Sequence, residues 1–253
     1  MYTRALSTLL ISACSITSLF GQTNLQLFYD FGSDRKQITA TLEMFKADKW
    51  GSTFLFVDQD FRTRTRDHHP SLSAGNEAPC GTYFEISRAL NLWQQSVLSP
   101  LSLHVEYNGG VYDQYYVNNA WLLGAEWFIH TSNFKKTLTL QVLYKSIAKA
   151  HSDIPMQLTA VWGADDFFGL RGLRFSGFID FWWQDHVAFA HSDFSQPVRK
   201  STTLLAEPQL WYNIGRHVGC DNLHIGTEIE LTNNFATYDG FKCNPCVGLK
   251  WVF

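Results

Sequence analysis

The sequence predicts an all-β protein, a transmembrane antiparallel β-barrel of about 12 strands in meander order. Three observations indicate this fold class. Apolar and polar residues alternate with a period of two along many short segments. After residue 22, no segment has the roughly 18 apolar residues that a membrane-spanning helix needs. The chain ends on alternating apolar residues, the last of which is Phe253.

The amino-acid composition disagrees with a plain water-soluble domain. Aromatic residues make up 15% of the chain, with 9 Trp and 20 Phe, whereas charged residues make up only 17%. Soluble domains usually have roughly 25% charged residues. The net charge of −3 is too small to indicate a nucleic-acid partner.

Residues 1–21 have the features of a secretory signal peptide. Arg4 supplies a positive charge, residues 5–20 are apolar or small, and Gly21 offers a cleavage point before Gln22. The alternative is lipoprotein processing, because residues 11–14 resemble a lipoprotein cleavage box with Cys14 as the acylated residue. In the first case, residues 22–253 form the barrel domain.

Twelve segments of this domain carry the period-two alternation. In the clearest of them, Leu103 and Val105 alternate with His104 and Glu106. Each segment has eight to twelve residues, close to the roughly 9–11 residues that cross a bilayer as a tilted strand. The predicted strands are 24–31, 37–46, 50–61, 82–92, 101–108, 119–129, 137–147, 156–163, 173–183, 204–214, 222–231 and 244–253.

The connections between these segments alternate in length. With the N-terminus in the periplasm, short turns face the periplasm and long polar connections face outward, which is typical of bacterial outer-membrane barrels. The face opposite the apolar residues is polar and charged, so we expect a wet interior and a closed sheet, since lipid tolerates no unpaired strand edge. The short connections are 47–49, 93–100, 130–136, 164–172 and 215–221, and the long ones are 62–81, 109–118, 148–155, 184–201 and 232–243.

The last segment is the most specific single signal. Val247, Leu249, Trp251 and Phe253 occupy alternate positions and end the chain. They resemble the C-terminal signature of outer-membrane barrels, which the barrel-assembly machinery reads. We therefore expect the protein in the outer membrane of a Gram-negative bacterium.

A twelve-stranded barrel lies between filled eight-stranded barrels and the open pores of larger ones, so we expect a channel about wide enough for one small solute. Its predicted lining combines carboxylates, a few bases and aromatic rings. Aromatic faces stack on flat rings and carboxylates accept hydrogen bonds from hydroxyls, which suits a ring-plus-sugar solute such as a nucleoside. The candidate lining residues are Phe28, Asp30, Glu43, Phe54, Phe56, Asp58, Glu85, Glu106, Lys145, Arg174, Asp180, Trp182 and Glu228.

One hairpin resembles a known family. Residues 43–50, Glu-Met-Phe-Lys-Ala-Asp-Lys-Trp, are followed by polar and aromatic residues at every second position up to Asp58. This is similar to the second hairpin of the nucleoside-specific channel-forming porins (Tsx type), and residues 83–86 and 177–181 resemble two later strands. The resemblance implies a monomeric twelve-stranded barrel that passes nucleosides by facilitated diffusion.

The chain departs from this family at four positions. Ser87 stands where the family has a second acid, and Arg88 comes one residue early. Phe54 and Phe56 stand where the family has Tyr, which removes two hydroxyls. Without a bulge, Arg88 is expected to point at lipid, which costs roughly 2–4 kcal/mol at the bilayer midplane.

Four cysteines would remain after processing. Cys80 and the pair Cys243 and Cys246 are expected in loops on one rim, where a disulfide between Cys80 and either of them could form. Cys220 is expected in a turn at the opposite end. No metal site and no cofactor is expected.

Two other functions remain as alternatives. A receptor or structural barrel would act through its extracellular loops, where Arg62, Arg64 and Arg66 could attract anionic solutes or lipopolysaccharide phosphates. A lipid hydrolase is the weaker alternative, because Ala-His-Ser-Asp at 150–153 and 190–193 places His and Ser on opposite strand faces. A third pair, His69 and Ser71, flanks Pro70, which disfavours a regular strand. We expect no enzymatic activity, and as partners membrane lipids, lipopolysaccharide and a small solute.

Overall fold

The structure is a computed structural model that describes residues 22–32, 36–62, 78–112, 116–190 and 196–253. In this part of the chain, 13 strands form one sheet. No helix of the described residues is long and apolar enough to cross a membrane. The predicted signal peptide, with Cys14, lies outside these residues. The strands are β1 (Gln22–Asp30), β2 (Gln37–Asp48), β3 (Gly51–Arg62), β4 (Ala78–Leu90), β5 (Leu101–Tyr112), β6 (Tyr116–His130), β7 (Lys136–Ile147), β8 (Met156–Asp165), β9 (Leu173–Phe189), β10 (Pro197–Ala206), β11 (Gln209–Asn213), β12 (Leu223–Asn233) and β13 (Phe241–Val252).

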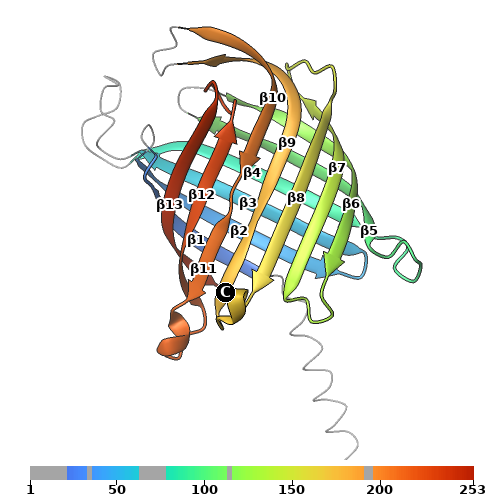
Figure 1. The fold of residues 1–253 in the computed structure, drawn as a ribbon, viewed down its shortest axis with the longest axis vertical. Helices are drawn as coiled ribbons and strands as arrows, with labels where there is room; N and C mark the ends of the chain where they lie inside the picture. The colour runs from blue at the N-terminus through green and yellow to red at the C-terminus, as the bar shows by residue number, and fades with distance from the viewer. Residues whose placement is uncertain (1–21, 33–35, 63–77, 113–115, 191–195) are drawn as a thin grey trace, which may run out of the picture.

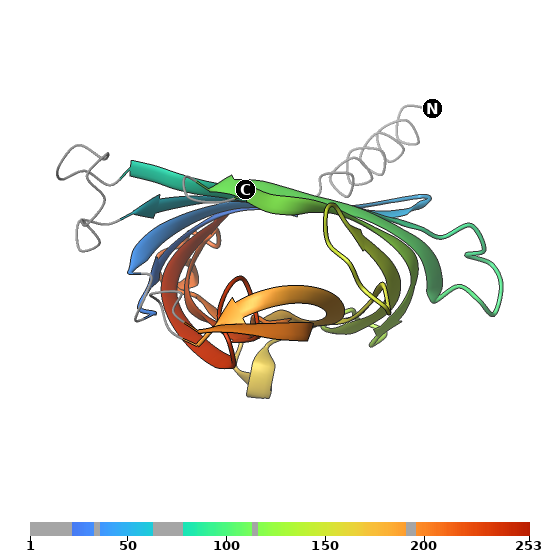
Figure 2. The same cartoon turned by 90° about the horizontal axis from the view of Figure 1, so that it is seen from above.

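The sheet closes into a barrel. Strands pair antiparallel with their neighbours in sequence from β1 to β9, and β1 also pairs with β13, with Leu25 opposite Trp251. Figure 1 shows the tilted strands, and Figure 2 shows the oval outline of the barrel from above. Closure pairs the backbone of both edge strands, as a lipid environment requires.

The 13 strands fill 12 positions around the barrel. β10 and β11 occupy successive parts of one position, and both lie between β9 and β12. The interruption falls at Pro208, which has no backbone N–H to give to a ladder. Hydrogen bonds bridge the gap, from Glu207 N to Phe178 O (3.0 Å) and from Ile229 N to Pro208 O (3.0 Å). The twelve-stranded barrel is confirmed, with its tenth strand broken in two.

Burial is inverted relative to a water-soluble protein. Leu25 and Leu27 are 46% and 51% exposed, whereas Gln26 between them is 1% exposed. The same order recurs across the barrel: Leu103 is exposed while His104 and Glu106 are buried. Apolar side chains therefore form the outer surface and polar ones the interior, as in transmembrane barrels.

The two ends of the barrel differ. β1 begins where β13 ends, beside the tight turn that joins Asp48 to Gly51, and we take this as the periplasmic end because such barrels have short periplasmic turns. At the other end the strands run past the predicted boundaries, so that the loops predicted at 109–118 and 184–201 are largely strand. Backbone pairing between β9 and β10 continues there as far as Phe189 and Pro197.

The cysteines also lie differently from the prediction. Cys80 is in β4, and Cys243 and Cys246 are in β13, so none of the three is in a loop. β1, β2 and β3 separate β4 from β13, and Cys243 is exposed on the outside while Cys246 is buried. None of the four described cysteines forms a disulfide, so the candidate bridge is absent from the structure. Cys220 lies in the turn between β11 and β12, as predicted.

Candidate functional site: the lumen of the barrel

The interior is the candidate site. Strand alternation places all the predicted lining residues at inward-facing positions, and they come from β1, β2, β3, β4, β5, β7, β9 and β12. Their role in binding stays a prediction. The inward-facing side chains of β4–β9 are called the His104 wall below, and those of β1–β3 and β11–β13 the Trp211 wall.

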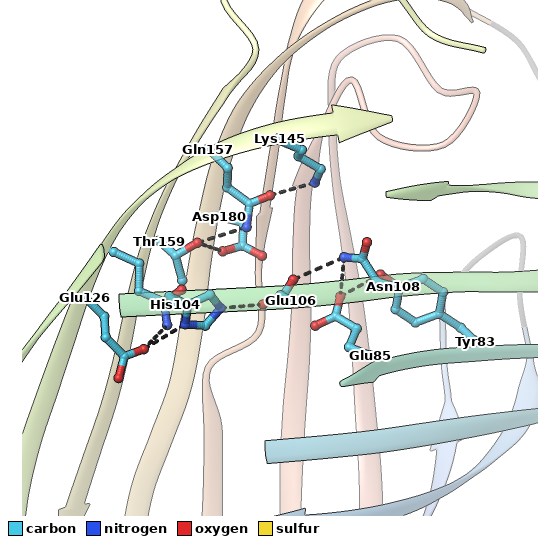
Figure 3. Close-up of polar contacts among 11 residues, drawn as sticks. Tyr83, Glu85, His104, Glu106, Asn108, Glu126, Lys145, Gln157, Thr159 and Asp180 are labelled. Atoms are coloured by element: carbon cyan, nitrogen blue, oxygen red, sulfur yellow. Dashed lines mark hydrogen bonds and ion pairs between the residues drawn. The ribbon is translucent and has the colours of Figure 1, made fainter. Parts of the chain in front are cut away.

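The His104 wall has a connected polar network (Figure 3). Glu85 accepts hydrogen bonds from the Tyr83 hydroxyl (2.5 Å) and from Asn108 Nδ2 (3.2 Å). His104 lies between two carboxylates, with Nδ1 2.8 Å from Glu126 and Nε2 3.2 Å from Glu106. Asn108 also donates to Glu106 (3.2 Å), so Tyr83 and Glu85 of β4 and three residues of β5 belong to one chain of contacts.

The network continues onto β7, β8 and β9. Lys145 Nζ donates to Gln157 Oε1 (2.6 Å) and lies 4.0 Å from the centre of the Trp182 ring. Gln157 donates to Thr159 (3.0 Å), which donates to Asp180 (2.5 Å). The Lys145 ammonium is close enough to interact electrostatically with Asp180, and also with Glu85 and Glu106 on the facing strands.

Part of the His104 wall is aliphatic, whereas the predicted lining contained only carboxylates, bases and aromatic rings. Ala120, Leu122 and Leu143 are at most 4% exposed and form one cluster with Ile147. Leu122 lies between Glu106 and Lys145 in the strand register, and therefore faces inward. The neighbouring residues Leu123 and Val142 are on the outer surface, at 52% exposed each, so these two strands are apolar on both faces here.

The Trp211 wall is built around two aromatic rings. Phe28 and Trp211 have ring centres 5.5 Å apart and are buried together. The rings lie against two glycines that face each other across β12 and β13: a Cβ at Gly226 would be 2.4 Å from the Trp211 ring, and one at Gly248 2.6 Å from Phe28. Lys250 Nζ lies over the Trp211 ring at 3.9 Å.

Carboxylates surround these rings. Glu228 accepts a hydrogen bond from Gln209 (2.5 Å), Asp58 one from Thr41 (2.6 Å), and Glu43 one from Asn24 (2.9 Å). Glu228 is close enough to Asp58 and Lys250 for their charges to interact. The interior thus carries more acids than bases on both walls.

The remaining predicted residues lie along β3 or near the ends of the lumen. Phe54 and Phe56 have ring centres 6.0 Å apart on β3. Asp30, at the outer end of β1, accepts a hydrogen bond from Gly32 N (2.6 Å), which holds the start of a loop. Arg174, at the periplasmic end of β9, pairs with Asp165 (2.5 Å) and is half-exposed.

Arg88 does face away from the lumen, but it does not meet the bilayer midplane. Its two terminal nitrogens each lie 2.8 Å from Asp48, at the periplasmic turn, and Nη1 also donates to Thr53 (3.0 Å). The hydrogen bonds from Arg88 lower the pKa of Asp48 to about 2. The expected midplane cost therefore does not apply.

A cap lies over part of the outer opening. The hairpin of β9 and β10 bends across it in Figure 2 and contacts the loop between β12 and β13. Lys200 pairs with Asp239 (2.5 Å), and His186 Nε2 lies 2.8 Å from Asn234 O. These contacts join the hairpin to a loop that is far from it in the sequence.

The hydrolase motifs form no nucleophile–base pair in the described residues. His151 Nδ1 lies 2.7 Å from Asp185, which raises the pKa of His151, while the Ser152 hydroxyl donates to the carbonyls of Ile154 and Trp183. Residues 191–193 of the second repeat, and His69 and Ser71, lie outside the described residues, as do Arg64 and Arg66. Within the described ranges, no three His, Cys, Asp or Glu side chains are grouped to hold a metal ion.

Trp211, Gln26 and His104 are site residues that the sequence-based candidate list omits. Gln26 and His104 alternate with Phe28 and Glu106 on the same strands, so strict alternation from those two residues would have found them. Trp211 lies on β11 opposite Gly226 of β12, so only the strand register places it in the lumen. Trp121 and Trp127, in contrast, are on the outer surface, at 55% and 40% exposed.

A closed antiparallel barrel with an apolar outer surface and a polar lumen defines a transmembrane protein of the outer membrane. Within that class, a family model described as a domain of unknown function (DUF5020) matches residues 22–253, and the chain belongs to this family. No curated protein sequence matches the chain significantly.

Among solved structures, the NanC porin is similar at 9% identity over 90% of this chain and 98% of that one, with a TM-score of 0.53. At this identity the likeness extends to the fold alone. The outer membrane phospholipase of Salmonella typhi matches at 10% identity over 92% and 90% of the two chains (TM-score 0.47). The outer membrane channel DcaP of Acinetobacter baumannii matches at 9% identity over 92% and 96% (TM-score 0.41).

Proposed function

We propose that this barrel is an outer-membrane channel for facilitated diffusion of small polar solutes, and that nucleoside-like solutes are the leading class. The observation that carries the proposal is the lumen lining, in which aromatic rings and carboxylates lie side by side. Phe28, Glu106 and Trp182 are at most 9% exposed, so these lining side chains are closely packed. A twelve-stranded barrel of this kind is expected to pass small solutes one at a time.

An aromatic row on β3 and β4 supports a flat-ring solute. The ring of Phe56 lies 6.0 Å from Phe54 and 5.9 Å from Tyr83, and Asp58 and Glu85 flank this row on the same inner face. Rings can stack on its faces, while the carboxylates accept hydrogen bonds from sugar hydroxyls. Both interactions are weak and repeated along the wall, so that a solute can enter and also leave.

Single-channel recording in planar bilayers tests the proposal, with adenosine, ribose or no solute added. We expect an open channel that adenosine blocks briefly and ribose blocks less. Phe56→Ala should shorten the adenosine blocks about tenfold, because one stacking contact contributes roughly 1–3 kcal/mol. Leu55→Ala, on the same strand but facing lipid, is the matched control and should leave them unchanged.

Two outcomes count against the proposal in different ways. Folded protein without any conductance would reject the channel and favour a receptor role for the capped outer end, which the contact between Lys200 and Asp239 supports. An open channel that adenosine does not block would reject the nucleoside-like solute and leave the channel in place.

A further inference from the structure

On the Trp211 wall, the rings of Trp211 and Phe28 form an aromatic site, called the seat below. The Lys250 ammonium occupies this site. Gly226 and Gly248 allow the rings of Trp211 and Phe28 to lie against the barrel wall, and the Lys250 ammonium lies on the Trp211 face at 3.9 Å. A cation on an indole face is attracted by the negative charge of the ring face. The geometry therefore fits a positively charged nitrogen next to a flat apolar surface.

Lys250 is held at this seat less firmly than Lys145 is held on the other wall. Lys145 combines its ring contact with a hydrogen bond to Gln157 at 2.6 Å. For Lys250, the ring is the one direct contact recorded among the described residues, and Glu43 and Glu228 act on it from a longer range. Its ammonium can leave the ring without breaking an ion pair in this part of the chain.

A buried acceptor beside the seat is unused. Gln26 is 1% exposed, and its Nε2 donates to Asn24 (2.8 Å) and Glu43 (3.5 Å). Its Oε1 finds no hydrogen-bond partner among the described residues. Gln26 lies opposite Lys250 in the register of β1 and β13, so the two side chains extend from the same part of the wall. An unsatisfied buried acceptor is costly, and an N–H donor would relieve that cost.

We propose that the seat binds a small organic amine in transit, a solute class in addition to nucleoside-like solutes, and this rests on the proposed channel function. The ammonium group takes the place of the Lys250 ammonium on Trp211 and donates to Gln26 Oε1, while Glu228 supplies the opposite charge. The apolar part of the amine lies against Phe28. The carboxylates of this wall repel anions of the same shape.

Isothermal titration calorimetry of the purified protein in detergent tests this with three ligands of matched shape: phenethylamine, 2-phenylethanol and phenylacetate. We expect phenethylamine to bind best and phenylacetate not to bind. Glu228→Gln should weaken phenethylamine binding about tenfold, as expected for one interaction with a charged group. Lys250→Met should strengthen it by about the same factor, because the competing cation is removed.

Lys135→Met is the matched control, since Lys135 pairs with Asp166 in a periplasmic turn and should leave binding unchanged. Trp211→Phe, which keeps a ring at the seat, gives a second test and should weaken binding less than Glu228→Gln. Equal binding of the three ligands, no binding of the amine, or weaker binding in Lys250→Met would overturn the proposal. Amine binding by a protein without conductance would support the amine site and reject the channel. Conductance by a protein that does not prefer the amine would support the channel and reject the amine site.

Discussion

The two walls of the lumen share one kind of contact, but the groups around that contact differ. Each has a lysine ammonium over a tryptophan ring, at 4.0 Å for Lys145 and Trp182 and at 3.9 Å for Lys250 and Trp211. Polar side chains bond to one another on both walls. The walls differ in that Lys145 also donates a hydrogen bond to Gln157, whereas on the Trp211 wall Gln26 Oε1 has no partner among the described residues.

This difference separates a structural wall from one that can bind. A network whose members satisfy one another strengthens the barrel but offers a solute little, because the solute would have to replace existing bonds. A wall with a weakly held cation and an unused acceptor gains from a ligand that supplies a donor. Three effects of mutation are expected from this contrast, from the largest to the smallest.

The largest effect is expected from His104→Ala on the His104 wall. The change leaves Glu106 and Glu126 without their shared partner, and loss of one member of a buried charged group costs roughly 3–5 kcal/mol. Urea unfolding in lipid vesicles, followed by tryptophan fluorescence, measures the free energy of unfolding. Glu228→Gln on the other wall is the control and should change it by less than about 1 kcal/mol. Equal losses in the two variants would remove the distinction between the walls.

An intermediate effect is expected from the two lysines compared directly. Lys145→Met and Lys250→Met each remove one positive charge from an acid-rich lumen, so both should raise the permeability for K⁺ relative to Cl⁻, measured as reversal potential in a KCl gradient. Only Lys145→Met should also lower the free energy of unfolding, by about 1 kcal/mol, because it leaves Gln157 Oε1 without its donor. A larger stability loss in Lys250→Met would reverse the assignment of the walls.

The smallest effect lies outside both walls, at Asp48. Arg88 lowers the pKa of this carboxyl from 3.8 to about 2. Because the folded-state pKa is depressed, the stabilisation is present above about pH 4 and is lost as the pH falls through about 2. Asp48→Asn should therefore flatten the pH dependence of unfolding between these values, with no change in conductance. A conductance change in this variant would show that the turn affects the lumen.

The sequence predicted the barrel because the alternation of lipid-facing and water-facing side chains is a local property of each strand. Every predicted segment overlaps a strand and extends past its ends by at most two residues, although the segment at 204–214 spans the break at Pro208. The outer strand ends were less predictable, since the polar Asp185 interrupts the apolar face of β9 while backbone pairing with β10 continues.

The site was predictable only as a list of inward positions. Which of these side chains meet depends on the tilt and register of twelve closed strands. That register brings Lys250 over Trp211, and it separates Cys80 from Cys243 by three strands. Leu122 and Leu143 show the converse, since apolar residues at inward positions are indistinguishable from lipid-facing ones until the register is known.

The paired glycines allow two aromatic rings to lie directly against the barrel wall. A methyl group at position 226 or 248 would come within 2.4 Å of the Trp211 ring or 2.6 Å of the Phe28 ring. At position 226 it would also lie 2.5 Å from Leu210 O, so Gly226→Ala requires the indole or the neighbouring strand to shift. In the channel that we propose, a shift of the indole away from the wall would narrow the lumen without changing which residues line it. Related chains could thus differ in the largest molecule they admit through a residue that never touches it.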